Sequence, residues 1–168
     1  MITTKHIDEL ERILSDLAAE HRQLVGLAHR HRQALRDADG AEITRIALQR
    51  DGINGRLVEL NEARLSVTAH IAGALGQQAS EVTVRYVISM LEGSRSASLG
   101  AIADDLKRSI VESRREHSIL RDATAAFAGH LGGVLHRAVE LCAPARTYTA
   151  AGRVAIGSSV PSALDVRH

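Results

Sequence analysis

The sequence predicts an all-α protein: a long antiparallel helical hairpin plus a third long helix in a coiled-coil-like bundle, followed by a flexible C-terminal tail. Three long segments carry apolar residues at alternating steps of three and four, as in helices that pack along one seam. The two prolines are Pro144 and Pro161, so the first 143 residues lack the strongest helix breaker. Only 2% of the 168 residues are aromatic, which leaves aliphatic side chains to fill the core. We therefore expect a helical domain over residues 1–143 and a tail over 144–168.

The first helix is predicted from about Thr4 to Asp37. A helix of this length spans about 50 Å, which fits a hairpin or bundle better than a small compact domain. Its apolar stripe comprises Ile7, Leu10, Leu14, Leu17, His21, Leu24, Ala28, His31 and Leu35.

The second helix follows a turn over residues 37–40. Asp39 and Glu42 stand at the spacing of a capping box. In such a box each of the two side chains accepts a hydrogen bond from the backbone N–H of the other residue. So short a turn makes the two helices antiparallel neighbours. Gly52 and Gly55 interrupt the second helix and indicate either a local break or a close approach of two backbones. The second stripe comprises Ile43, Ile46, Arg50, Ile53, Leu57, Leu60, Arg64, Val67, Ile71 and Ala74.

A short helix and two connections are predicted next. Residues 76–79 form one connection, and Ser80 is expected to cap a helix over residues 81–92. The β-branched residues between 82 and 88 leave a strand open as an alternative. Residues 93–96 form the next connection.

The last long helix is predicted from about Ala97 to Cys142, and Pro144 ends it. The stretch Gly129–Gly133 is rich in glycine, which favours close helix approach over phosphate binding because no strand precedes it. The stripe of this helix comprises Leu99, Ala103, Leu106, Ile110, Ser113, His117, Leu120, Thr124, Phe127, Leu131, Val134, Ala138 and Leu141.

Charge and cysteine content narrow the class of protein. The formal net charge is +1, from 21 basic and 20 acidic residues, so we expect no nucleic-acid partner. There is no run of 18 apolar residues and no signal-peptide pattern, so we expect no integral membrane segment. Cys142 is the single cysteine, which excludes an internal disulfide and fits the cytoplasm. It is either a small buried hydrophobe or a reactive thiol.

The motifs of common catalytic and metal sites are missing from the sequence. No Glu has a His three residues later, and no two His stand four apart, which argues against the metal sites of helical bundles. No phosphate-binding loop or nucleophile elbow occurs either. His21, His31 and His117 lie on the stripes, where polar residues set the register of packed helices. We therefore expect no enzyme activity, no cofactor and no metal, with a helical-bundle enzyme or metal protein as the opposing hypothesis.

The ordered pattern is similar to a known family. The second arm of the hairpin ends in Leu57-Val-Glu-Leu-Asn-Glu-Ala-Arg64, a short helix and a long helix follow, and the tail contains Thr147-Tyr148-Thr-Ala-Ala-Gly152-Arg153. Over about residues 5–153 the chain resembles the FlgN family of flagellar type III export chaperones. The resemblance implies a cytoplasmic chaperone that binds the C-terminal helical segments of hook-associated proteins, those of the hook–filament junction, and keeps them competent for export. It also implies contact with components of the export apparatus.

A client helix requires an exposed apolar surface, and the C-terminal third of the last helix is the best candidate. Alternatively, these residues pack on the hairpin, or the stripes join copies of the chain into a homo-oligomeric coiled-coil scaffold. The predicted client-binding residues are Leu120, Phe127, Leu131, Val134, Leu135, Leu141 and Tyr148.

Overall fold

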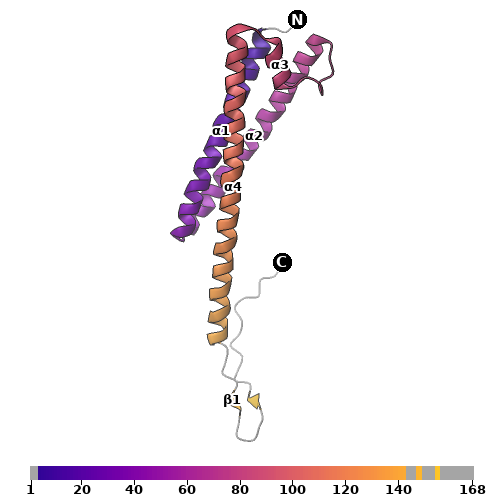
Figure 1. Cartoon of the computed structure of the whole chain (residues 1–168). Helices are drawn as coiled ribbons and strands as arrows, with labels where there is room; N and C mark the ends of the chain where they lie inside the picture. Colours follow the sequence, from indigo (N-terminus) through magenta and orange to yellow (C-terminus); the bar gives the residue numbers. More distant parts are fainter. Residues whose placement is uncertain (1–3, 143–146, 149–153, 156–168) are drawn as a thin grey trace. The chain divides into compact units, whose positions relative to one another are not determined.

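The computed structural model describes residues 4–142, 147–148 and 154–155, and its helices confirm the predicted all-α fold (Figure 1). One short antiparallel strand pair accompanies them, with Thr147 opposite Ala155 and Tyr148 opposite Val154. The chain forms two compact units, residues 1–125 and 126–168, which are described separately below. The elements are α1 (Thr4–Arg36), α2 (Gly40–Leu75), α3 (Val84–Met90), α4 (Gly93–Cys142), β1 (Thr147–Tyr148) and β2 (Val154–Ala155).

Helices α1 and α2 form the predicted antiparallel hairpin. Ion pairs join the start of α2 to the end of α1 and the middle of α2 to the middle of α1: Arg30 to Glu42 at 2.5 Å and Arg56 to Glu20 at 2.8 Å. The apolar members of the α1 stripe are buried, as the heptad pattern predicts. They are Ile7, Leu10, Leu14, Leu17, Leu24, Ala28 and Leu35.

The turn between α1 and α2 bears out half of the predicted capping box. Asp39 is the N-cap of α2, and its Oδ1 accepts a hydrogen bond from the Glu42 backbone N–H at 2.9 Å. The Glu42 carboxylate does not return to the cap. It binds Arg30 and Arg45, each at 2.5 Å, because two guanidinium groups attract it more strongly than a backbone N–H does. The expectation of a reciprocal box was therefore wrong.

Helix α2 runs through Gly52 and Gly55 without interruption. A Cβ on Gly55 would meet nothing within 4 Å, and one on Gly52 would meet only the flexible end of Arg56 at 3.9 Å. These glycines therefore mark neither a break nor a close approach of two backbones. Gly76, by contrast, ends α2 in the left-handed conformation, with φ of 69°, where glycine is favoured.

The short helix is helical as expected, but both of its predicted ends were wrong. Thr83, rather than Ser80, is the N-cap, and its Oγ1 accepts a hydrogen bond from the Tyr86 N–H at 3.1 Å. Val82 before the cap and Val87 after it are both buried in one apolar cluster. This pair is a hydrophobic staple, which fixes where the helix starts.

Helix α4 begins at Gly93, so the connection after α3 is only residues 91–92 and not the predicted 93–96. Gly93 has a φ of 63°, a conformation open to glycine at little cost. The turn is tied together by Ser96, whose hydroxyl donates to the Ile88 carbonyl at 3.1 Å. Since Ser94, Arg95 and Ser96 are helical, their polar composition did not prevent helix formation.

Within the first unit, α4 runs parallel to α1 (Figure 1). Three ion pairs of increasing residue number join them: Asp8 to Arg95 at 3.2 Å, Arg22 to Asp105 at 2.6 Å, and Arg32 to Glu116. Four helices supply the main core, which includes Leu10, Leu14, Ile71, Val87 and Leu99. A smaller cluster between α1 and α2 comprises Leu24, Leu27, Ala34, Ile46 and Ile53.

The second unit contains residues 126–142 of α4 and the pair β1–β2. The strand pair was not predicted, because two-residue strands leave no period in the sequence. The predicted flexible tail, residues 144–168, lies largely outside the described residues.

Candidate helix-binding surface

The second unit exposes an apolar surface on α4, which we call the distal stripe: Phe127, Leu131, Val134, Leu135, Ala138, Val139 and Leu141. Phe127 is half-buried, whereas the exposed fractions of Leu131 and Leu141 are 45% and 87%. Val134 and Leu135 lie between them at 50% and 65%. Large apolar side chains that remain this exposed on one side of a helix are typical of a surface that another protein covers.

The predicted client-binding residues do not all belong to this surface. Leu120 lies in the first unit and is only 5% exposed, so it is a packing residue there. Tyr148 lies in β1, but its side chain is outside the described part of the structure, as is that of Cys142. The remaining five predicted residues belong to the distal stripe.

The sequence makes this stretch helical and gives it one apolar side. Residues 126–142 contain no proline, and alanines at 126, 128 and 138 favour helix. At about 100° per residue, Gly129 falls on the side of the helix opposite Val134 and Leu131, and Gly132 and Gly133 each lie about 100° or more from both. A Cβ on any of these glycines would meet nothing within 4 Å, so no described segment makes the close approach that the sequence suggested.

A layer of basic side chains lies between α1, α2 and α4 in the first unit. Burial, assisted by Arg114 and His117, lowers the pKa of His21, and its buried Nδ1 has no hydrogen-bond partner among the described residues. Burial and the charge of Arg50 lower the pKa of both His31 and His117. These histidines are therefore held in the neutral form near pH 7, which suits a structural role.

Carboxylates lie at the edge of the same bundle. A hydrogen bond from Arg32, with a further contribution from His29, lowers the pKa of Glu116, and Arg22 does the same for Asp105. Among the described residues no three His, Cys, Asp or Glu side chains are grouped so that they could hold a metal ion. None of the helices in this part of the chain has the length and apolar content needed to cross a membrane.

Sequence reasoning missed a groove in the first unit. It has a volume of about 750 Å³ and is lined by residues of all four helices. The groove is lined by Leu14 and Leu17 of α1, by Val58 of α2 and by Val111 of α4. Both valines lie off the heptad stripes, which is why the seam pattern alone gave no signal for them.

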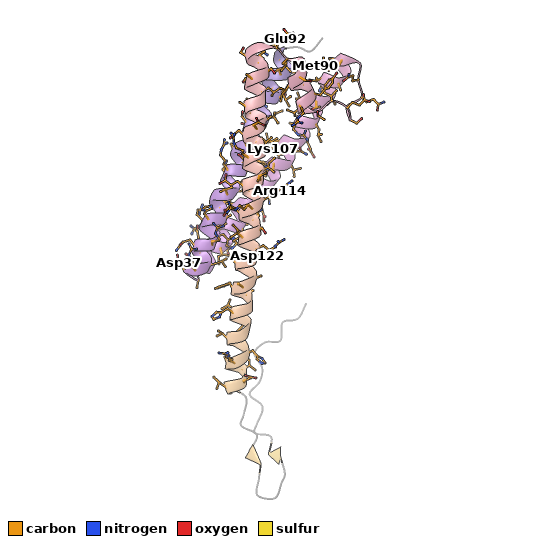
Figure 2. The ribbon with its side chains drawn as sticks, in the orientation of Figure 1. Asp37, Met90, Glu92, Lys107, Arg114 and Asp122 are labelled. Carbon is orange, nitrogen blue, oxygen red and sulfur yellow. The ribbon has the colours of Figure 1, made fainter. Side chains whose placement is uncertain are left out.

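Lys107 and Arg114 mark the part of α4 that borders this groove (Figure 2). In the sequence alone, both residues belong to a charged helix surface that also contains acidic residues. Their position beside the groove depends on how α2 and α4 diverge, which no local pattern encodes.

Comparisons with known proteins add no relative to this description. No protein-family model, curated protein or solved structure matches the chain. The two apolar surfaces and the basic layer are therefore the observations on which a functional assignment depends.

Proposed function

We propose that this chain is a cytoplasmic flagellar export chaperone that binds an amphipathic helix of a client protein through the distal stripe. The clients are the C-terminal helical segments of the hook-associated proteins of the hook–filament junction, as the resemblance to the FlgN family implies. The role is binding without catalysis. The observation that carries the proposal is the exposure of the distal stripe, from 45% at Leu131 to 87% at Leu141.

The shape of the stripe supports a helical client. Phe127, Leu131, Val134, Ala138 and Leu141 follow one another at steps of four and three, so they form one continuous ridge along the helix. A partner helix with the same repeat packs its own apolar side chains into the holes between these positions.

The width of the stripe favours a client over a simple two-stranded coiled coil of this chain. Leu135 and Val139 add a second row beside the ridge, so the apolar side covers about 160° of the helix, from Leu141 to Val139, at 3.6 residues per turn. A two-stranded coiled coil needs only the narrower a/d seam. A surface this wide fits a partner that contributes more than one helix or wraps around α4.

The charges beside the stripe also support an external partner. His130 and Arg137 flank the ridge, and neither forms an ion pair with a residue that the structure describes. Flanking charges of packed helices usually select the partner and its orientation. A client with acidic residues beside its apolar stripe would satisfy them.

The test is binding of the full chain to purified C-terminal segments of the junction proteins, measured by calorimetry. We expect a stoichiometric complex. Phe127→Asp and Leu131→Asp each place a charge in the apolar contact, and each should weaken binding by roughly 30-fold, the loss of about 2 kcal/mol typical of a binding hot spot. Leu135→Asp, at a position 65% exposed, provides a further variant whose folding is not at risk.

Leu48→Asp is the matched control, because Leu48 is an equally apolar side chain, 70% exposed, on α2 of the first unit. It should leave affinity unchanged, and circular dichroism should show full helix content in every variant. Binding that survives both Phe127→Asp and Leu131→Asp would show that the distal stripe is not the client site. A stable oligomer in light scattering that ignores the junction proteins would instead support the homo-oligomeric scaffold.

A further inference from the structure

The groove of the first unit has an apolar interior. Leu14, Leu17, Leu57, Leu106 and Ile110 all line it, and the two leucines of α1 are buried at 1% and 6% exposure. The walls remain open to solvent, because Val58 on α2 is 59% exposed and Val111 on α4 is 61% exposed. The groove therefore combines a buried apolar interior with exposed apolar side chains that a partner could cover.

Three basic side chains border the groove, and they are Arg64, Lys107 and Arg114. Among the described residues that line it, none is acidic. Arg64 donates two hydrogen bonds to the Asn61 Oδ1, at 2.9 and 3.1 Å, and thus keeps its full charge uncompensated. Lys107 and Arg114 form no ion pair with any residue that the structure describes.

Other basic side chains of the same bundle, by contrast, form ion pairs. Arg22 and Arg32 of α1 are each paired with a carboxylate of α4, and Arg56 of α2 is paired with Glu20. The carboxylates of Asp105, Glu116 and Glu20 are thus paired with guanidinium groups that do not line the groove. An anionic group from outside the unit would find Lys107 and Arg114 unpaired.

The spacing of the two α4 cations defines the occupant further. Lys107 and Arg114 are seven residues apart, so they lie on the same side of α4 at a separation of about 10 Å. A helix lying along the groove would meet both cations with two carboxylates that are themselves seven residues apart. The lining stretch of α4, from Ala103 to Arg114, spans about 16 Å, or three helical turns.

We propose that the groove binds an acidic amphipathic helix of a partner protein, about three turns long, with two carboxylates at seven-residue spacing. The open side of the groove favours this occupant over an acyl chain, since an amphipathic helix presents its polar side to water, whereas an acyl chain would leave apolar surface exposed. The proposal does not depend on the distal stripe, which lies in the other unit.

The experiment uses the full chain and fluorescently labelled, end-capped 15-residue helical peptides. The acidic peptide carries leucines at heptad a and d positions and glutamates at two flanking positions seven residues apart. A matched basic peptide has lysines at those two positions. A third peptide keeps the composition of the acidic one but places its glutamates on opposite sides of the helix. Fluorescence anisotropy at low and high salt measures the affinities.

We expect the acidic peptide to bind about tenfold more tightly than either of the others, the effect of two partly exposed ion pairs, and to lose that advantage at high salt. The double variant Lys107→Glu with Arg114→Glu should reverse the preference in favour of the basic peptide. Both positions are exposed, so these changes leave the fold intact. Val58→Asp with Val111→Asp should abolish binding of all three peptides, whereas Leu131→Asp in the distal stripe should change nothing.

Equal binding of the acidic and basic peptides, or the absence of binding to any of them, would overturn the proposal. So would displacement of the acidic peptide by dodecanoate at micromolar concentration, which would assign the groove to acyl chains. A doubling of mass in light scattering that Val58→Asp with Val111→Asp abolishes would assign the groove to a second copy of the chain.

Discussion

Two stretches of α4 carry the same heptad stripe, but the side chains of the stripe differ in exposure between them. Between residues 99 and 120 the stripe is largely covered: Leu99 and Leu120 are 0% and 5% exposed, and Leu106 and Ile110 are half-buried. Between residues 127 and 141 it is open, and Leu141 is 87% exposed. The helix type and the apolar spacing are the same in both stretches, so neither of them explains the difference.

The residues beside the stripe do explain it. In the first stretch Asp105 and Glu116 pair with Arg22 and Arg32 of α1, and Ser109 and Ser113 are buried at 4% and 3% exposure. The second stretch has no described ion pair to another helix. The stripe therefore sets which side of α4 is apolar, whereas the flanking residues decide whether α1 packs against it.

The largest expected effect comes from removing one leucine in each stretch. Leu99→Ala should lower the free energy of unfolding by about 2–5 kcal/mol, because it leaves a cavity in the main core. Leu131→Ala, at a side chain 45% exposed, should lower it by less than about 1 kcal/mol. Urea unfolding followed by circular dichroism measures both values. Equal losses would show that the second stretch is packed in the folded chain and would remove the contrast.

A smaller effect is expected from pH, and it should arise only in the first stretch and its neighbours. Burial lowers the pKa of His21, His31 and His117 below their ordinary 6.5, so the unfolded chain binds more protons than the folded one. This contribution to stability is complete above about pH 7.5 and is lost as the pH falls below 6.5 and through the lowered pKa of the histidines in the folded chain. We expect a lower melting temperature at pH 5.5 than at pH 7.5.

The variants His21→Gln and His117→Gln should each reduce this dependence. The carboxylates Asp105 and Glu116 do not confuse the comparison, since their pKa values lie below the ordinary 3.8 and 4.5 and both stay ionised at pH 5.5. A dependence that survives both variants would place the titrating group elsewhere.

The sequence predicted much of this fold because the relevant signals are local. The apolar members of the stripe from Ile7 to Leu35 are buried where its period placed them, and Asp39 caps α2. The start of α3 was missed because two hydroxyl residues, Ser80 and Thr83, compete as caps. Thr83 wins through the burial of Val82 and Val87, a tertiary contact that propensity does not contain.

The candidate sites were less predictable, because they too depend on contacts between residues that are far apart in the sequence. Five of the seven predicted client-binding residues lie on the distal stripe, where Leu131, Val134, Leu135 and Leu141 are exposed in the part of the chain that the structure describes. Leu120 has the same heptad position as Val134, two heptads later, and yet is buried, since the pairing of Arg32 with Glu116, 84 residues apart, holds that part of α4 against α1. The groove and its cations depend on such distant pairings throughout.

The smallest expected effect sharpens the comparison by making one substitution in both regions. Gly55→Ala in α2 fills open space and removes a poor helix former, so it should raise the free energy of unfolding by about 0.5–1 kcal/mol. Gly132→Ala in the second stretch meets equally open space and should increase the helical circular-dichroism signal slightly. It should not move the urea midpoint, because the second stretch adds little buried surface to the cooperative unit. A midpoint that rises equally in both variants would mean that residues 126–142 unfold together with the hairpin, and that α4 is one cooperative helix from end to end.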